Sequence, residues 1–162
     1  MQLSHRELCL TALLTALITI SGSLKIPSFV SGSEFQLSAP IAVAICGVFG
    51  IKRYLTAGIA ASVLCLMLGT QNIFNVFIAL SFRAVVACCS LLWGNSKLFY
   101  VLAGPLASAA ARLLLSLFVG KAAIALIAAA VPGMIFTAFA APLFAAVLNR
   151  AAFIKAYAKL PR

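Results

Sequence analysis

Acidic residues are almost absent from this chain. Its 162 residues include only two Asp or Glu against twelve Lys or Arg, and charged residues make up 9% of the total. A soluble domain is about a quarter charged, whereas this chain is 65% hydrophobic with a mean hydropathy of +1.19. The composition predicts an integral membrane protein, organised as a single membrane domain over residues 1–162. That length leaves no room for an appended soluble catalytic or nucleotide-binding domain.

Catalytic and metal-binding patterns are also missing. The sequence contains no GxSxG, HExxH or Walker A motif and no paired intramembrane aspartates. Its five cysteines form no CxxC pair and all lie in apolar segments, so we expect no metal, no cofactor and no disulfide framework. Proton-driven transport is disfavoured because no carboxylate or histidine lies within an apolar segment. We expect a protein that is not an enzyme.

Long apolar segments are what the chain has in abundance. Crossing about 30 Å of hydrocarbon takes about 20 apolar residues in a helix. Charges, glycines and asparagines divide the chain into six predicted helices, at residues 8–24, 37–51, 54–70, 73–94, 98–119 and 122–148. The second and third are short for a full crossing, and the sixth contains Pro132 and Pro142, which predict a kink or tilt. The predicted fold class is an all-α, compact bundle of six transmembrane helices.

The basic residues predict the orientation of this bundle. If the N-terminus is cytoplasmic, only Lys25 and Lys121 fall on the outer side. The cytoplasmic side then holds eight basic residues: Arg6, Lys52, Arg53, Lys97, Arg150, Lys155, Lys159 and Arg162. This bias predicts that both termini are cytoplasmic. The basic tail at 150–162 is predicted to lie against anionic lipid headgroups and not to bind nucleic acid.

The other two basic residues are arginines inside predicted spans. Arg83 lies in "NVFIALSFRAVVACC" and Arg112 in "ASAAARLLLSLFVG". Placing a charge at the bilayer centre costs at least about 2.5–3.5 kcal/mol, so such a group normally faces the bundle interior and has a partner. By helical rise the two lie about 14 Å and about 10 Å below the outer ends of their helices.

Few anions are available to pair with these arginines. Glu7 is predicted at the cytoplasmic end and Glu34 in the long first outer loop, and the chain has no other carboxylate. The shortage favours a bound anionic ligand, such as a carboxylate held by a guanidinium fork. The alternative stays open that Arg83 and Arg112 donate to backbone carbonyls and stabilise helix packing.

Polar side chains on the same faces favour a pocket that opens outward. Three of them cluster at the outer start of the fourth predicted helix: Gln71, Asn72 and Asn75. The eleven residues from Asn72 to Arg83 return to nearly the same helical face, and Ser108 and Arg112 share a face at i, i+4. Asparagine and serine at helix starts are also common caps, so a capping role for Asn72 and Asn75 stays open.

Several stretches together resemble a known family, the substrate-binding S components of energy-coupling factor (ECF) vitamin transporters. The first helix, "ALLTALITI", carries a small face at Ala12 and Ala16, and a long outer loop, "IPSFVSGSEFQ", follows it. The stretches "GVFGIKRYLTAG", "LSFRAVVA" and "APLFAAVLNR" are also similar to the family's segments. The chain is somewhat short for the family and has no motif that identifies a substrate.

The resemblance implies a function and a site. S components have no ATPase activity; they sit in the bacterial cell membrane and capture a vitamin-like molecule from outside. They deliver it together with a transmembrane scaffold subunit and two cytoplasmic ATPases. The implied site lies among helices four to six, with the first outer loop as its cap. In this chain it comprises Asn72, Asn75, Arg83, Ser108 and Arg112, with Glu34 and Gln36 in the cap and Ala12 and Ala16 on the scaffold-facing side.

Two other functions fit the residues without the resemblance. A stand-alone carrier or channel for a small anion would transport its substrate as a lone protein. A structural subunit of a larger membrane complex would bind no ligand, and its arginines would be satisfied by backbone. The sequence does not choose among vitamins or other small nutrients.

Overall fold

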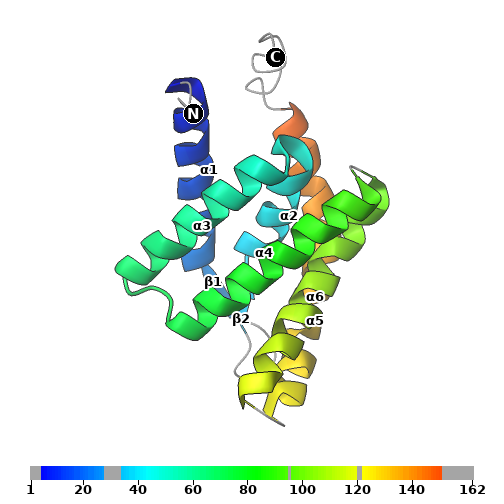
Figure 1. Cartoon of the computed structure of the whole chain (residues 1–162). Coiled ribbons are helices and arrows are strands. Elements are labelled where there is room, and N and C mark those ends of the chain that lie inside the picture. The colour runs from blue at the N-terminus through cyan, green and yellow to red at the C-terminus, as the bar shows by residue number, and fades with distance from the viewer. Residues whose placement is uncertain (1–4, 28–33, 95, 120–121, 151–162) are drawn as a thin grey trace.

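The computed structural model of the chain describes residues 5–27, 34–94, 96–119 and 122–150. These ranges contain six helices: α1 (His5–Ser23), α2 (Ser38–Phe49), α3 (Ile51–Met67), α4 (Ile73–Trp93), α5 (Lys97–Val119) and α6 (Ala122–Arg150) (Figure 1). The predicted all-α bundle of six helices is confirmed, with ends within three residues of the expected ones. An antiparallel hairpin of β1 (Lys25–Pro27) and β2 (Glu34–Gln36) was not predicted.

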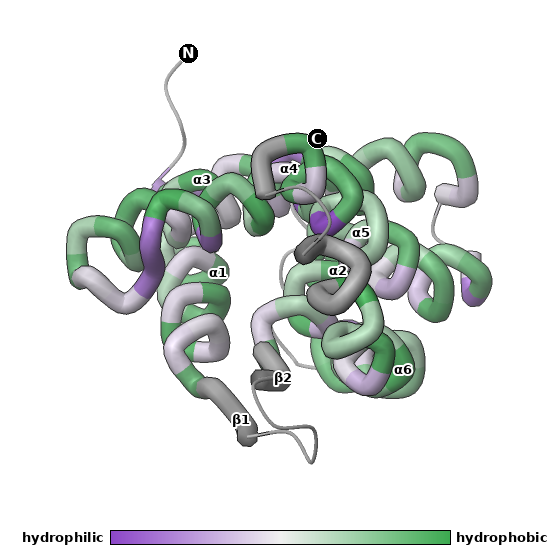
Figure 2. Tube along the Cα trace, turned by 90° about the horizontal axis from the view of Figure 1, so that it is seen from below, coloured by the Kyte–Doolittle hydropathy of each residue, from purple (hydrophilic) through white to green (hydrophobic). Residues whose placement is uncertain are grey.

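Four of these helices are long and apolar enough to cross a membrane. They are His5–Ser23, Ile73–Trp93, Lys97–Leu117 and Ile127–Arg150. Apolar positions run along most of each helix (Figure 2), and large side chains such as Leu92 and Leu117 lie on the outside of the bundle. Such a surface is stable only against lipid. The chain is a multi-pass membrane protein.

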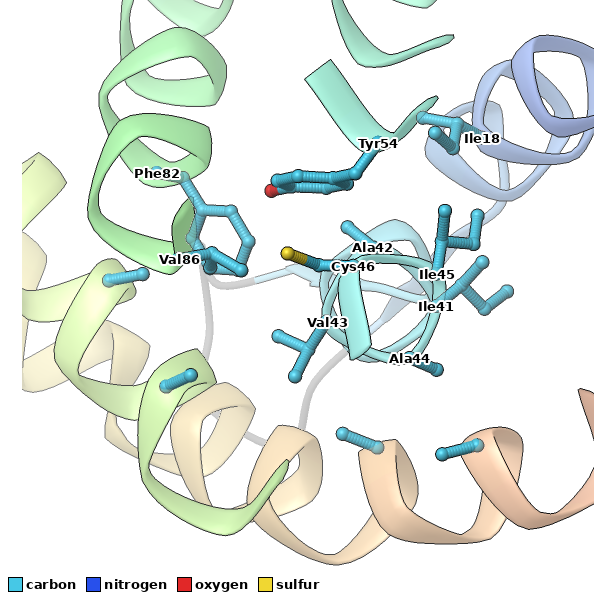
Figure 3. Packing of buried hydrophobic residues seen from close by; sticks show 14 of the residues in the cluster. Ile18, Ile41, Ala42, Val43, Ala44, Ile45, Cys46, Tyr54, Phe82 and Val86 are labelled. Atoms are coloured by element: carbon cyan, nitrogen blue, oxygen red, sulfur yellow. The ribbon is translucent and has the colours of Figure 1, made fainter. Parts of the chain in front are cut away.

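The short helix α2 lies at the centre of the bundle. It has 12 residues, about 18 Å by helical rise, and every residue from Pro40 to Cys46 is buried. Its side chains radiate toward Ile18 of α1, Tyr54 of α3, and Phe82 and Val86 of α4 (Figure 3). A helix that is apolar on all sides belongs inside a protein. The shortness of α2 therefore reflects burial among other helices.

Small residues allow the helices around α2 to approach closely. Ala103, Ala107 and Ala111 of α5 are fully buried. A Cβ placed on Gly104 would overlap Cγ2 of Thr137 on α6, so these two helices pack with almost no side chain between them. Close contact through small residues is the usual way in which membrane helices associate. The α6 helix continues through both of its inner prolines.

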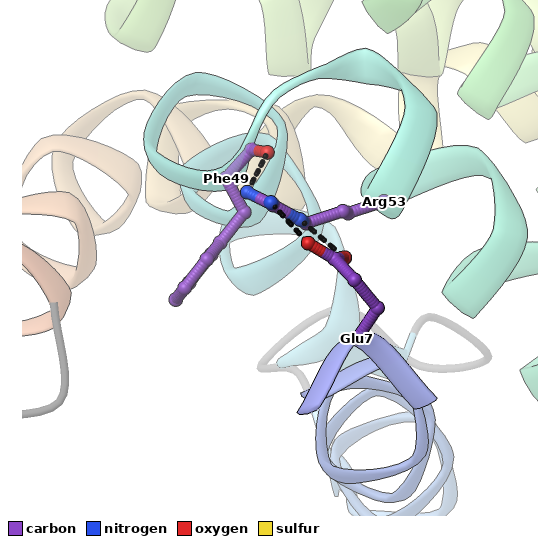
Figure 4. A network of polar contacts seen from close by, with 3 residues as sticks. All are labelled: Glu7, Phe49 and Arg53. Atoms are coloured by element: carbon purple, nitrogen blue, oxygen red, sulfur yellow. Dashed lines mark hydrogen bonds and ion pairs between the residues drawn. The ribbon is translucent and has the colours of Figure 1, made fainter. Parts of the chain in front are cut away.

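An ion pair joins the starts of α1 and α3. Arg53 donates from Nη2 to Glu7 Oε1 at 2.7 Å and from Nε to Glu7 Oε2 at 3.0 Å, and its Nη1 donates to the Phe49 carbonyl at 3.4 Å (Figure 4). These ends carry basic residues that the charge bias assigns to the cytoplasmic side. Glu7 is thus engaged at that end, far along α1 from the residues that line the cavity described below.

Candidate ligand-binding site

A cavity of about 350 Å³ lies inside the bundle, and all six helices contribute to its wall. The resemblance implied a site among helices four to six; α1, α2 and α3 in fact line the cavity as well, through residues such as Gly22, Ala42 and Ser62. Among the sequence-predicted site residues, the structure brings four together on this wall: Asn75, Arg83, Ser108 and Arg112.

Arg83 crosses from α4 to α3 inside the bundle. Its side chain is only 7% exposed, and its Nη1 donates a hydrogen bond to the Ser62 hydroxyl oxygen at 2.6 Å. A Cβ on Gly58, one turn before Ser62, would overlap Nε of Arg83 and lie 2.6 Å from its Cδ. The missing side chain at Gly58 therefore makes room for the arginine stem, and Ser62 fixes its end.

The Nε of Arg83 is buried and has no hydrogen-bond partner within the described part of the chain. A buried guanidinium that makes one neutral hydrogen bond retains strong donor capacity, because it carries five N–H groups. A buried polar group that lacks a partner is energetically costly, and more so when it is charged. Because Nε lies against Gly58, the donors that Arg83 can offer to an anion in the cavity are the N–H groups of its two terminal nitrogens that do not bond to Ser62.

Arg112 reaches the same cavity from α5. It is partly buried, and its Nη1 donates to the Ser108 carbonyl oxygen of its own helix at 3.2 Å. This contact matches the backbone pairing considered from the sequence. It fixes one end of the guanidinium while the side chain still contributes to the cavity wall.

The cavity wall is electrostatically positive. Within residues 5–27, 34–94, 96–119 and 122–150, no ion pair to either arginine is present; the ion pair found there joins Glu7 and Arg53. The side chain of Glu34 lies outside the described residues. The first turn of α2 also lines the cavity, through Ser38, and the N-terminal end of a helix carries partial positive charge. The arrangement favours an anionic guest.

Among the remaining predicted residues, Asn72, Ala12 and Ala16 do not line the cavity. Asn72 is exposed and caps α4, where its Oδ1 accepts a hydrogen bond from the Asn75 N–H at 2.8 Å. The backbone of Glu34 and Gln36 forms β2, but their side chains are outside the described residues. Ala12 and Ala16 are exposed on the outer side of α1.

Three polar contributors to the wall were not among the predicted site residues, and two of them lie outside the expected helices four to six. Ser38 comes from α2, Ser62 from α3 and Thr137 from α6. The Thr137 hydroxyl donates to the Gly133 carbonyl at 2.8 Å and can still accept. Of these positions, only Ser62 could have been found from the sequence. It follows Gly58 at i, i+4, so a position without a side chain and a hydroxyl lie on one face of α3.

One curated relative matches most of the chain. Protein BioX of Lysinibacillus sphaericus is 47% identical over 135 residues, which cover 83% of this chain and 81% of the relative. The chain belongs to the BioX family. No protein-family model and no solved structure matches it.

The packing of the Arg83 side chain against Gly58 of α3 can be tested by a double-mutant cycle. Alanine in a helix interior is favoured over glycine by about 1 kcal/mol, but at Gly58 its Cβ would collide with Arg83. Overpacking costs about 1–3 kcal/mol. We expect Gly58→Ala to lower the melting temperature of the detergent-purified protein, and to be neutral or stabilising in the Arg83→Ala background.

Gly22→Ala is the matched control for this cycle. Its added Cβ would lie 3.7 Å from the nearest atom, Nε2 of Gln71, which is ordinary contact. It should therefore have the same small effect in both backgrounds. An equal effect of Gly58→Ala with and without Arg83 would contradict the proposed packing.

Proposed function

We propose that this chain is the substrate-capture subunit of an ECF-type importer and binds a small carboxylate nutrient from outside the cell. The observation that carries the proposal is the pair of arginines on α4 and α5. Both contribute to one cavity inside a membrane bundle, and among the described residues neither has an acidic partner. A carboxylate suits such a site because guanidinium binds it through two parallel hydrogen bonds.

The place of the cavity in the bundle supports capture from outside. Its wall includes Gly22 at the end of α1, Ser38 at the start of α2 and Gln71 between α3 and α4. These three positions are neighbours, because a Cβ on Gly22 would lie within 4 Å of both Ser38 and Gln71. The charge bias puts these helix ends on the outer side. The cavity therefore reaches the outer end of the bundle.

The relative's name supports a vitamin-type acid. A biotin-related nutrient, which this name suggests, carries a carboxylate and would suit the positive cavity. The proposed role is capture and delivery without chemistry on the ligand, so the protein is not an enzyme. The proposed location is the cell membrane of a bacterium.

The outer side of α1 supports a protein partner. Leu10, Leu14 and Ile18 face the core, whereas Ala12 and Ala16 are exposed on the opposite side. A helix with small exposed residues lets another helix approach closely in lipid. We assign this face to the transmembrane scaffold subunit, which in turn carries two cytoplasmic ATPases.

Transport by the lone protein separates this proposal from a stand-alone carrier. The purified protein should bind its ligand without nucleotide, because the cavity is formed by this chain alone. Liposomes that contain only this protein should accumulate no radiolabelled carboxylic acid from a panel that includes biotin. Adding the scaffold and ATPases with ATP should produce uptake. Sustained uptake by the lone protein would contradict the proposal.

The α1 face makes a second prediction. Ala16→Trp should prevent close approach of a partner helix, so the tagged chain should no longer co-purify with the scaffold and ATPases of its own host. The stability of the lone protein should be unchanged, because Ala16 is exposed. Ala84→Trp is the matched control, since Ala84 is exposed on α4. Normal co-purification of Ala16→Trp, or equal loss in both variants, would contradict this assignment.

A further inference from the structure

Two guanidinium groups, Arg83 and Arg112, share the cavity wall. We infer that the ligand is an aliphatic dicarboxylate whose two acidic groups pair with these two arginines. The inference rests on the proposed function and specifies which acids the site accepts. It separates diacids from monoacids such as biotin.

The two arginines are held by different helices. Arg83 on α4 is fixed by Ser62 of α3, while Arg112 is fixed by the Ser108 carbonyl of its own helix α5. These separate anchors favour separate binding points for two acidic groups. A carboxylate has two oxygens and is filled by one bidentate guanidinium. A monoacid that uses its carboxylate in this way therefore neutralises one arginine and leaves the other charge in the cavity.

The charge left by a monoacid is unfavourable for two reasons. Arg83 is nearly fully buried and its Nε lacks a partner among the described residues, so its charge is poorly solvated. Two positive groups on one cavity wall also repel each other, and screening is weak away from water. A second acidic group removes both penalties. The site therefore suits a ligand that carries two negative charges.

The rest of the wall favours a hydrocarbon segment between the two acids. Apolar residues come from α2, α3, α4 and α6, and they include Ala42, Ala61, Ile78, Ala79, Phe82 and Ala130. The side-chain amide of Asn75 can donate to carboxylate oxygens that the arginines do not reach. An aliphatic chain suits the apolar part of the wall because it has no polar groups to desolvate.

Calorimetry with matched pairs of acids tests the inference. Detergent-purified protein is titrated with a series of straight-chain α,ω-dicarboxylates, each beside the monocarboxylate of the same chain length, with biotin in parallel. We expect the best dicarboxylate to bind about ten- to a hundredfold more tightly than its monocarboxylate, the range for one added hydrogen-bonded charge.

Variants of the two arginines test whether the preference for dicarboxylates over monocarboxylates depends on these residues. Arg83→Gln and Arg112→Gln should each weaken dicarboxylate binding and bring the ratio of the two affinities close to one. Lys97→Gln removes the same charge at an exposed position at the start of α5 and should keep the ratio of the wild type. Size-exclusion profiles and melting temperatures check folding. Arg112 is the less buried of the two, so its variant keeps the test valid if Arg83→Gln is unstable.

Several outcomes would overturn the inference. Equal affinity for monoacids and diacids, tight binding of biotin alone, or failure of every acid to bind would each do so. A rise in dicarboxylate affinity in Glu34→Gln would do so as well, because it would mean that Glu34 neutralises one arginine. Equal affinities, tight binding of biotin alone, or the Glu34→Gln result would leave the proposed function standing if the scaffold and ATPases still co-purify with the chain. Failure of every acid to bind would also contradict the carboxylate part of the proposed function.

Discussion

Arg83 lies across α3 inside the bundle, where Gly58 makes room for its stem and Ser62 accepts a hydrogen bond from its Nη1 at 2.6 Å. A charge in this position is tolerated only because α3 offers both a gap and a hydroxyl on one face. This contact makes α3 part of the site, although α3 has no charged group of its own at this depth. It leaves a buried cation that makes one neutral hydrogen bond with the described residues, and this cation sets the chemistry of the cavity.

The central helix explains why a cavity exists beside this arginine. At 12 residues, α2 is too short to fill the thickness of a membrane. Its residues from Val43 to Cys46 pack in the core, whereas Ser38, Ala39 and Ala42 at its other end are small and line the cavity. Arg83 of α4 and Arg112 of α5 line the same cavity as these small residues.

The sequence predicted the helices well because each apolar run ends at a glycine, a charge or an asparagine. Helical spacing put Ser108 and Arg112 on one face, and the resemblance grouped them with Asn75 and Arg83. The eleven-residue spacing also put Asn72 on the face of Arg83, but Asn72 caps α4 and does not line the cavity. The sequence did not reveal that Ser62 accepts a hydrogen bond from Arg83. In lipid both the buried and the exposed sides of a helix are apolar, so the sequence does not show which side of α3 faces the interior of the bundle. The three-residue strands of the hairpin are likewise too short for a recognisable alternation.

Native mass spectrometry of the detergent-purified protein tests most directly whether the two arginines hold an anion. We predict that the wild type retains a small acidic molecule, which collisional activation releases so that its mass identifies it. The double variant Arg83→Gln, Arg112→Gln should be folded and carry no such mass. A molecule retained equally by both proteins, or a wild-type ligand that has no acidic group, would contradict the account.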